Sequence, residues 1–242
     1  MQRIILAALL AGLLSSAAHA DSTSVAVAAN FTKVAEELAP LFKAETGHDV
    51  TYSFGATGQL YTQITQGAPF DILLSADDTR PTKAVTDGLG VDGSVFTYAI
   101  GTLVLYSTSL DVTDGEAALK GKFDKLAIAD PEAAPYGRAA VEALTAMGIY
   151  DTVKPQLVTG ENITQTLQFI ESGNAELGFV AASQVVGKAH VWAVPANLYE
   201  PIRQDAVLLK TAENNPAAKA YIDFLKSDTA VKVIEAAGYA VE

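Results

Sequence analysis

Short apolar runs alternate with amphipathic stretches along most of the chain. The runs hold about four to six residues, which is typical of strands buried in a parallel sheet, and apolar residues between them recur with a helical period. This alternation predicts an α/β protein built from right-handed βαβ units, with its ligand site at the carboxyl ends of the strands. The predicted strands are 24–29, 49–54, 71–75, 125–129, 177–180 and 190–194, and the predicted helices are 31–47, 58–66, 81–87, 136–147, 164–172, 216–226 and 228–237.

Four of these helices begin at a small or polar cluster that directly follows an apolar run. The clusters are 28–32 (AANFT), 54–58 (FGATG), 130–137 (DPEAAPYG) and 160–163 (GENI). Free backbone N–H groups and the positive end of the helix dipole meet at a helix N-terminus. Four such ends brought together would form an anion receptor without any formal charge, so the pattern predicts a protein that surrounds a small oxyanion.

Two longer extended segments, 96–106 and 198–209, interrupt the alternation, and they bracket one set of strands and helices. If both segments cross between lobes, residues 21–97 plus 204–242 form lobe I and residues 98–203 form lobe II. The alternative is a single doubly wound domain with two long strands. With two lobes, each lobe contributes two of the four helix starts to the cleft between them.

The first twenty residues have the pattern of a secretory signal peptide. Arg3 precedes an apolar segment over 4–14 that is too short to span a bilayer, and Ala-His-Ala at 18–20 fits a cleavage site. The sequence has no cysteine, so neither a disulfide nor a lipid-modified cysteine is available. We therefore expect an exported protein with no direct membrane anchor.

Composition disfavours two classes of partner and one class of function. Residues 21–242 hold 15 Lys and Arg against 28 Asp and Glu, and a net charge of −13 argues against nucleic acid and anionic lipid. No G-x-S-x-G, P-loop or H-E-x-x-H motif occurs. His48 and His190 fit surface or strand-end positions, and the Asp77-Asp78 pair fits a solvated helix start. Because no nucleophile and base can be paired, we expect no enzyme activity.

Several stretches carry a resemblance to a known family. They are VAVAANFTKVAEELAPLFKAETGHDVTYSFGATGQLYTQITQGAPFDILLSADD, FTYAIGTLVLY, LAIADPEAAPYGRAAVEAL and GENITQTLQFIESGNAELGFVAASQV. Together they resemble, over essentially the whole chain after residue 20, the periplasmic molybdate-binding proteins that feed an ABC importer. GAPFDILLSADD and ADPEAAPYG are the more specific parts.

The resemblance implies a two-lobed type II periplasmic-binding-protein fold, each lobe a mostly parallel sheet flanked by helices, with two crossover strands as the hinge. Such a protein is a periplasmic monomer that closes on molybdate or tungstate by hydrogen bonds alone. It uses no cofactor and no direct protein–metal ligand, and it delivers the anion to the importer permease in the inner membrane.

The resemblance also assigns site residues one by one. Asn30 matches the first anion-contacting position, Thr57 the second, Tyr136 the third helix start, and Ile163 a position that donates its main-chain N–H. One branch of the family has a tyrosine where this chain has Ala181, so we expect the Tyr136 hydroxyl to supply the missing donor.

Each assignment has a structural alternative. Asn30 and Thr57 fit simple N-caps, Tyr136 fits a half-buried aromatic residue with a solvated hydroxyl, and the side chain of Ile163 fits the core. Sulfate, phosphate or a small organic acid are alternative ligands. Iron(III) would need clustered tyrosines, and folding would have to gather Tyr136 with two others, Tyr150 and Tyr199.

Overall fold

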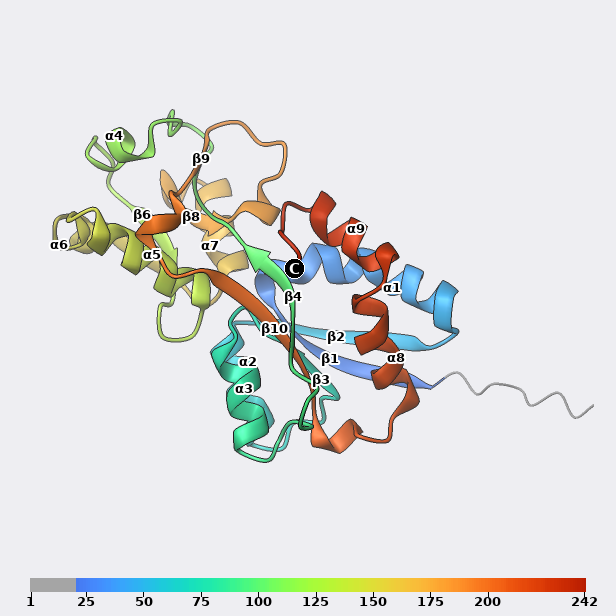
Figure 1. Cartoon of the computed structure of the whole chain (residues 1–242). Coiled ribbons are helices and arrows are strands. Elements are labelled where there is room, and N and C mark those ends of the chain that lie inside the picture. Colours follow the sequence, from blue (N-terminus) through green and yellow to red (C-terminus); the bar gives the residue numbers. More distant parts are fainter. Residues whose placement is uncertain (1–20) are drawn as a thin grey trace, which may run out of the picture.

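The computed structural model describes residues 21–242, which fold around two five-stranded sheets (Figure 1). The predicted signal peptide, residues 1–20, lies outside the described residues. The first sheet has the order β2-β1-β3-β10-β4 and the second the order β7-β6-β8-β5-β9. The strands are β1 (Ser22–Ala28), β2 (Asp49–Gly55), β3 (Ile72–Leu74), β4 (Phe96–Gly101), β5 (Leu103–Ser107), β6 (Leu126–Ala129), β7 (Leu157–Gly160), β8 (Leu177–Ala181), β9 (Val191–Ala193) and β10 (Ile202–Leu208).

Each sheet contains one strand that runs against the other four. β10 pairs antiparallel with β3 and β4, and β5 pairs antiparallel with β8 and β9, whereas β1, β2 and β3, and likewise β6, β7 and β8, pair in parallel. The reversed strands are those by which the chain enters one sheet from the other. The expected segment 96–106 is accordingly divided at Thr102 into β4 and β5, which belong to different sheets.

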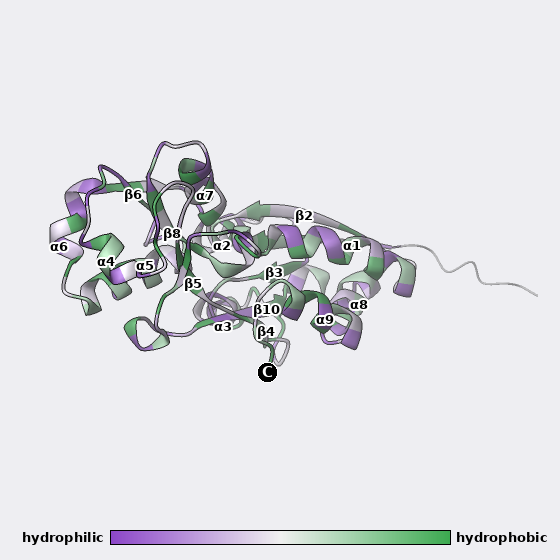
Figure 2. Ribbon diagram, turned by 90° about the horizontal axis from the view of Figure 1, so that it is seen from above, coloured by the Kyte–Doolittle hydropathy of each residue, from purple (hydrophilic) through white to green (hydrophobic). Residues whose placement is uncertain are grey.

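Helices cover both faces of each sheet. Val25 and Val27 pack with α1 (Thr32–Thr46), α8 (Pro216–Leu225) and α9 (Asp228–Ala236), while Ala26 packs with α2 (Thr57–Thr65) and α3 (Thr79–Thr86). The second sheet packs against α5 (Pro135–Ala146) on one face and α7 (Ile163–Glu171) on the other, with the short α4 (Gly115–Leu119) and α6 (Tyr150–Val153) at its periphery. Figure 2 shows α1 striped with hydrophilic and hydrophobic residues, as an amphipathic helix requires.

The expected α/β alternation and the two-lobed periplasmic-binding-protein fold are confirmed. All seven expected helices are present with ends shifted by at most two residues, the first being preceded by the short 3₁₀ turn η1 (Ala29–Phe31). The sequence analysis missed β7, because this strand is short, half-exposed and paired with β6 alone. The lobe boundaries at 97/98 and 203/204 stay a prediction. No helix within residues 21–242 is long and apolar enough to cross a membrane.

The start of α5 lies very close to the end of β6 at Gly137. A Cβ added at this position would overlap the carbonyl oxygen of Ala129. We therefore expect Gly137→Ala to lower the free energy of unfolding by about 1–3 kcal/mol, the usual cost of overpacking, in urea denaturation. Gly55→Ala is the control, since its Cβ would make only an ordinary contact of 3.4 Å with Leu60. Equal stability of the two variants would contradict this account.

Candidate anion-binding site

A small cavity lies where helix starts from both sheets meet. All four expected site residues line it: Asn30 follows β1, Thr57 opens α2, Tyr136 is the second residue of α5, and Ile163 opens α7. Among the described residues that line it, none is Asp, Glu, Lys, Arg or His. The lining residues are Ala28, Ala29, Asn30, Gly55, Ala56, Thr57, Ala76, Ala134, Pro135, Tyr136, Asn162 and Ile163.

Three helices present a backbone N–H to this cavity. The N–H groups of Thr57, Tyr136 and Ile163 have no hydrogen-bond acceptor within residues 21–242. In α7 the Asn162 Oδ1 accepts hydrogen bonds of 3.0 Å each from the N–H groups of Thr164 and Gln165. The N–H of Ile163 is not capped in this way. Each of these groups is a donor at the positive end of a helix, which is the arrangement that binds oxyanions.

Thr57 adds a hydroxyl donor to its backbone N–H. The N-cap of α2 is Ala56, so the alternative that Thr57 is only an N-cap is wrong. The Thr57 Oγ1 instead accepts a hydrogen bond of 3.0 Å from the backbone N–H of Ala76. Because this bond uses a lone pair of the oxygen, the hydroxyl hydrogen remains available to an acceptor in the cavity.

Asn30 has a different role from the one that its side chain suggests. Its Nδ2 donates to Gln204 Oε1 at 2.7 Å and to Tyr239 Oη at 2.9 Å, so both amide hydrogens are used within the protein. It is not an N-cap either, since Phe31 holds that position for α1. What Asn30 can offer to a ligand is therefore its backbone N–H.

The hydroxyl of Tyr136 is buried and protonated. The residue is 2% exposed, so the alternative of a solvated hydroxyl is wrong, and burial raises the pKa of Tyr136 well above its usual value. Its Oη accepts a hydrogen bond of 3.3 Å from Gln204 Nε2. Within residues 21–242 the hydroxyl donates no hydrogen bond of 3.5 Å or less, although the Tyr239 hydroxyl lies close enough to interact with it. Like Thr57, Tyr136 therefore retains a hydroxyl hydrogen.

Ile163 and Ala181 behave as their side chains predict. Ile163 is 3% exposed and its side chain packs in the core of the second sheet. Only its backbone N–H is therefore available to a ligand in the cavity. Ala181 is fully buried at the end of β8 and does not line the cavity. The sequence analysis missed the polar residues behind the cavity, Gln204 and Tyr239. Gln204 gives no local signal of its own, because it stands between Arg203 and Asp205 in the polar half of β10 (IRQDAVL).

The two halves of the molecule touch around the cavity. The N–H of Gly58 in α2 donates to the carbonyl of Ala133, which precedes α5, at 2.9 Å. On another side, Thr164 Oγ1 of α7 donates to the carbonyl of Ala29 at 3.2 Å. These bonds join helix starts from different sheets, so they keep the four ends in one arrangement.

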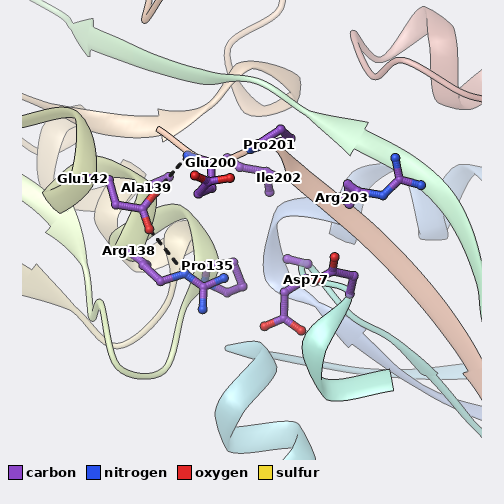
Figure 3. A pocket seen from close by; sticks show the side chains of 11 residues that line it. Asp77, Pro135, Arg138, Ala139, Glu142, Glu200, Pro201, Ile202 and Arg203 are labelled. Atoms are coloured by element: carbon purple, nitrogen blue, oxygen red, sulfur yellow. Dashed lines mark hydrogen bonds and ion pairs between the residues drawn. The ribbon is translucent and has the colours of Figure 1, made fainter. Parts of the chain in front are cut away.

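A second, charged pocket adjoins the cavity (Figure 3). Glu142 accepts a hydrogen bond of 3.0 Å from the N–H of Glu200 and lies 3.8 Å from Arg138. Asp77, which also lines this pocket, is 3% exposed and paired with Arg80, so the expected solvated position is wrong for this residue. Asp78 is exposed at the N-cap of α3, as expected. The carboxylates thus lie outside the neutral cavity. No group of three His, Asp or Glu side chains within residues 21–242 is placed to hold a metal ion.

Comparison with known proteins places the chain in a family. Residues 23–240 match the family of bacterial extracellular solute-binding proteins. The chain is 54% identical over 238 residues to the molybdate-binding protein ModA of Rhodobacter capsulatus, covering 97% of this chain and 94% of the relative. It is 49% identical over 245 residues to ModA of Azotobacter vinelandii, covering 98% and 97%.

The fold agrees with these sequence matches. The solved periplasmic molybdate-binding protein of Azotobacter vinelandii superimposes with a TM-score of 0.88 at 38% identity, over 91% of this chain and 99% of that one. The helix starts, the two sheets and the sequence match all indicate the same relationship. The chain belongs to the bacterial extracellular solute-binding proteins and, within them, to the family of periplasmic molybdate-binding proteins.

Proposed function

We propose that this protein captures molybdate or tungstate in the cavity between its lobes and delivers the anion to the permease of an ABC importer in the inner membrane. The lobes are residues 21–97 plus 204–242 and residues 98–203, and they close on the ligand. The protein is exported to the periplasm by the signal peptide at 1–20 and acts as a monomer without catalytic activity. Its membership of the molybdate-binding family supports this function.

The observation that carries the proposal is a cavity, lined mostly by buried residues, whose walls offer neutral donors and no ionised group. A fully ionised tetrahedral dianion has acceptors only, so it can satisfy donors on every side. Each hydrogen bond to such a charge contributes about 1.5–3 kcal/mol, which makes several neutral donors sufficient without a counter-charge.

The four residues divide the donors between backbone and side chain. Thr57 and Tyr136 offer a backbone N–H and a hydroxyl each, whereas Asn30 and Ile163 offer the backbone N–H alone. In this assignment the Tyr136 hydroxyl takes the place of the tyrosine that some relatives have at Ala181. The buried position of Tyr136 and the free hydrogen of its hydroxyl support this assignment.

The alternative ligands fit the cavity less well. Hydrogen phosphate carries a proton that needs an acceptor. Sulfate has shorter bonds to oxygen, and donors fixed at helix ends cannot move inward to reach the oxygens of this smaller anion. For iron(III), Tyr150 lies against Lys154 and Tyr199 Oη accepts the N–H of Leu103 at 3.2 Å, while only Tyr136 of the three tyrosines lines the cavity. Molybdate and tungstate are therefore favoured.

The first test of this function is selectivity. Molybdate and tungstate should bind with comparable affinity, and sulfate and phosphate should bind far more weakly. The reason is that the arrangement of donors fits only a large, fully ionised tetrahedral anion. Isothermal titration calorimetry with the four anions measures this directly. Sulfate binding within about tenfold of molybdate, a difference of about 1.4 kcal/mol or less, would contradict the size argument.

The second test removes single donors. Tyr136→Phe and Thr57→Ala each leave an acceptor of the buried anion unpaired, so each should lower molybdate affinity by about 5- to 150-fold, the equivalent of about 1–3 kcal/mol. Ile163→Val should change affinity little, because only its backbone N–H contacts the anion. Tyr150→Phe and Thr65→Ala are the matched controls, on half-buried and exposed side chains outside the cavity. Unchanged affinity in Tyr136→Phe would show that its ring only packs beside the site.

The third test concerns transport. Deletion of the gene should abolish uptake of trace radiolabelled molybdate, and the intact chain should restore it. A chain carrying both Tyr136→Phe and Thr57→Ala should restore uptake only at raised molybdate concentrations, because capture and not export is impaired. Normal uptake of trace molybdate in the deletion strain would contradict a role in the importer.

A further inference from the structure

Gln204 connects the cavity wall to the strand that returns from the second sheet. It lies in β10, is fully buried, and stands at a β-bulge between Gln204 and Asp205. Its Oε1 accepts from Asn30 Nδ2 at 2.7 Å and lies 3.2 Å from Tyr98 Oη, while its Nε2 donates to Tyr136 Oη at 3.3 Å. One side chain thus contacts Tyr98 in the first sheet and Tyr136 in α5, which packs against the second sheet.

The orientation of this amide follows from its neighbours. Asn30 Nδ2 also donates to Tyr239 Oη, and Tyr239 Oη in turn donates to the carbonyl of Asn30 at 2.9 Å, so the nitrogen of Asn30 must face Gln204. A reversed Gln204 amide would set two NH₂ groups against each other. Its oxygen therefore faces Asn30 and its nitrogen faces Tyr136.

We propose that Gln204 is a positioning residue that fixes the direction of the Tyr136 O–H bond and thereby selects against protonated oxyanions. Because Nε2–H occupies a lone pair of the Tyr136 oxygen, the hydroxyl hydrogen is directed away from Gln204. In this proposal it is the donor that faces the cavity. The wall then presents a donor at this position, and an anion that carries its own proton meets no acceptor there. This inference rests on the proposed function.

Two further observations agree with this role. A Cβ on Gly101, in β4, would overlap Tyr136 Oη and lie 2.7 Å from Gln204 Nε2, so the neighbouring strand leaves room for this contact. Thr57, the other hydroxyl of the cavity, is arranged in the same way by the N–H of Ala76. Both hydroxyls accept a bond from behind and keep their hydrogen for the cavity.

The test replaces the amide by a carboxylate of the same shape. In Gln204→Glu the ionised carboxylate accepts the hydrogen of Tyr136, so the hydroxyl turns its lone pairs to the cavity. Molybdate affinity should fall by about tenfold or more, the scale of about 1.4 kcal/mol or more. The ratio of molybdate to phosphate affinity should fall as well, since hydrogen phosphate gains an acceptor. Gln156→Glu makes the same charge change outside the cavity and should alter neither.

A double-mutant cycle separates bond direction from simple charge repulsion. Tyr136→Phe should lower molybdate affinity by about 5- to 150-fold in the unsubstituted protein but by less than about twofold in the Gln204→Glu background, where that hydroxyl no longer donates to the anion. Lowering the pH until the introduced carboxyl is protonated should recover affinity in Gln204→Glu, because a neutral carboxyl donates to Tyr136 as the amide does. The unsubstituted protein should change little over the same range.

The outcomes distinguish this inference from the proposed function. If the unsubstituted protein does not bind molybdate, the proposed function is wrong. If it binds molybdate but Tyr136→Phe has the same cost in both backgrounds, Gln204 does not direct the hydroxyl. Should Gln204→Glu fail to fold by circular dichroism, Gln204→Met is measured instead, since it removes the Nε2–H that directs the hydroxyl. An unchanged ratio of molybdate to phosphate affinity in that variant also overturns the inference.

Discussion

An excess of hydrogen-bond donors over acceptors at the cavity between the two sheets is the feature on which the rest of the structure depends. Backbone N–H groups at three helix starts and the hydroxyls of Thr57 and Tyr136 all lack an acceptor within residues 21–242. Unpaired buried donors are costly, so their gathering at one cavity indicates a ligand that supplies the acceptors. The oxygens of a small dianion can accept these hydrogen bonds, so no charged side chain is required.

The fold supplies this arrangement through strand direction. The helices that follow parallel strands all begin at the same edge of the sheet. In this way two helix starts from each sheet lie at the cavity. The reversed strands, β5 and β10, are the ones that connect the sheets. Gly101 ends β4, directly before the chain passes through Thr102 into β5, and Gln204 lies in β10. The two places where the chain passes between the sheets therefore also surround the hydroxyl of Tyr136.

Charge is kept near the cavity but out of it. Glu142, Glu200 and Asp77 line the adjoining pocket with Arg138, and the described part of the chain carries a large negative net charge. Local dipoles and donors dominate at a buried site, whereas exposed charges are screened over about 8 Å at physiological salt. An acidic protein can therefore hold a dianion, and the direction of each hydrogen bond, not the net charge, determines which anions fit.

The sequence by itself determined the α/β alternation, the helix starts and their meeting at one site, because apolar periodicity and capping chemistry are local properties of the chain. The resemblance to the molybdate-binding family named Asn30, Thr57, Tyr136 and Ile163, all of which line the cavity. The sequence did not indicate β7, whose edge position leaves only a weak pattern. Nor did it find that the Asn30 amide is used by Gln204 and Tyr239, which lie 174 and 209 positions away along the chain. Only the tertiary structure decides which groups remain free to donate, because hydrogen-bond partners so distant in sequence are chosen by packing and not by any local pattern.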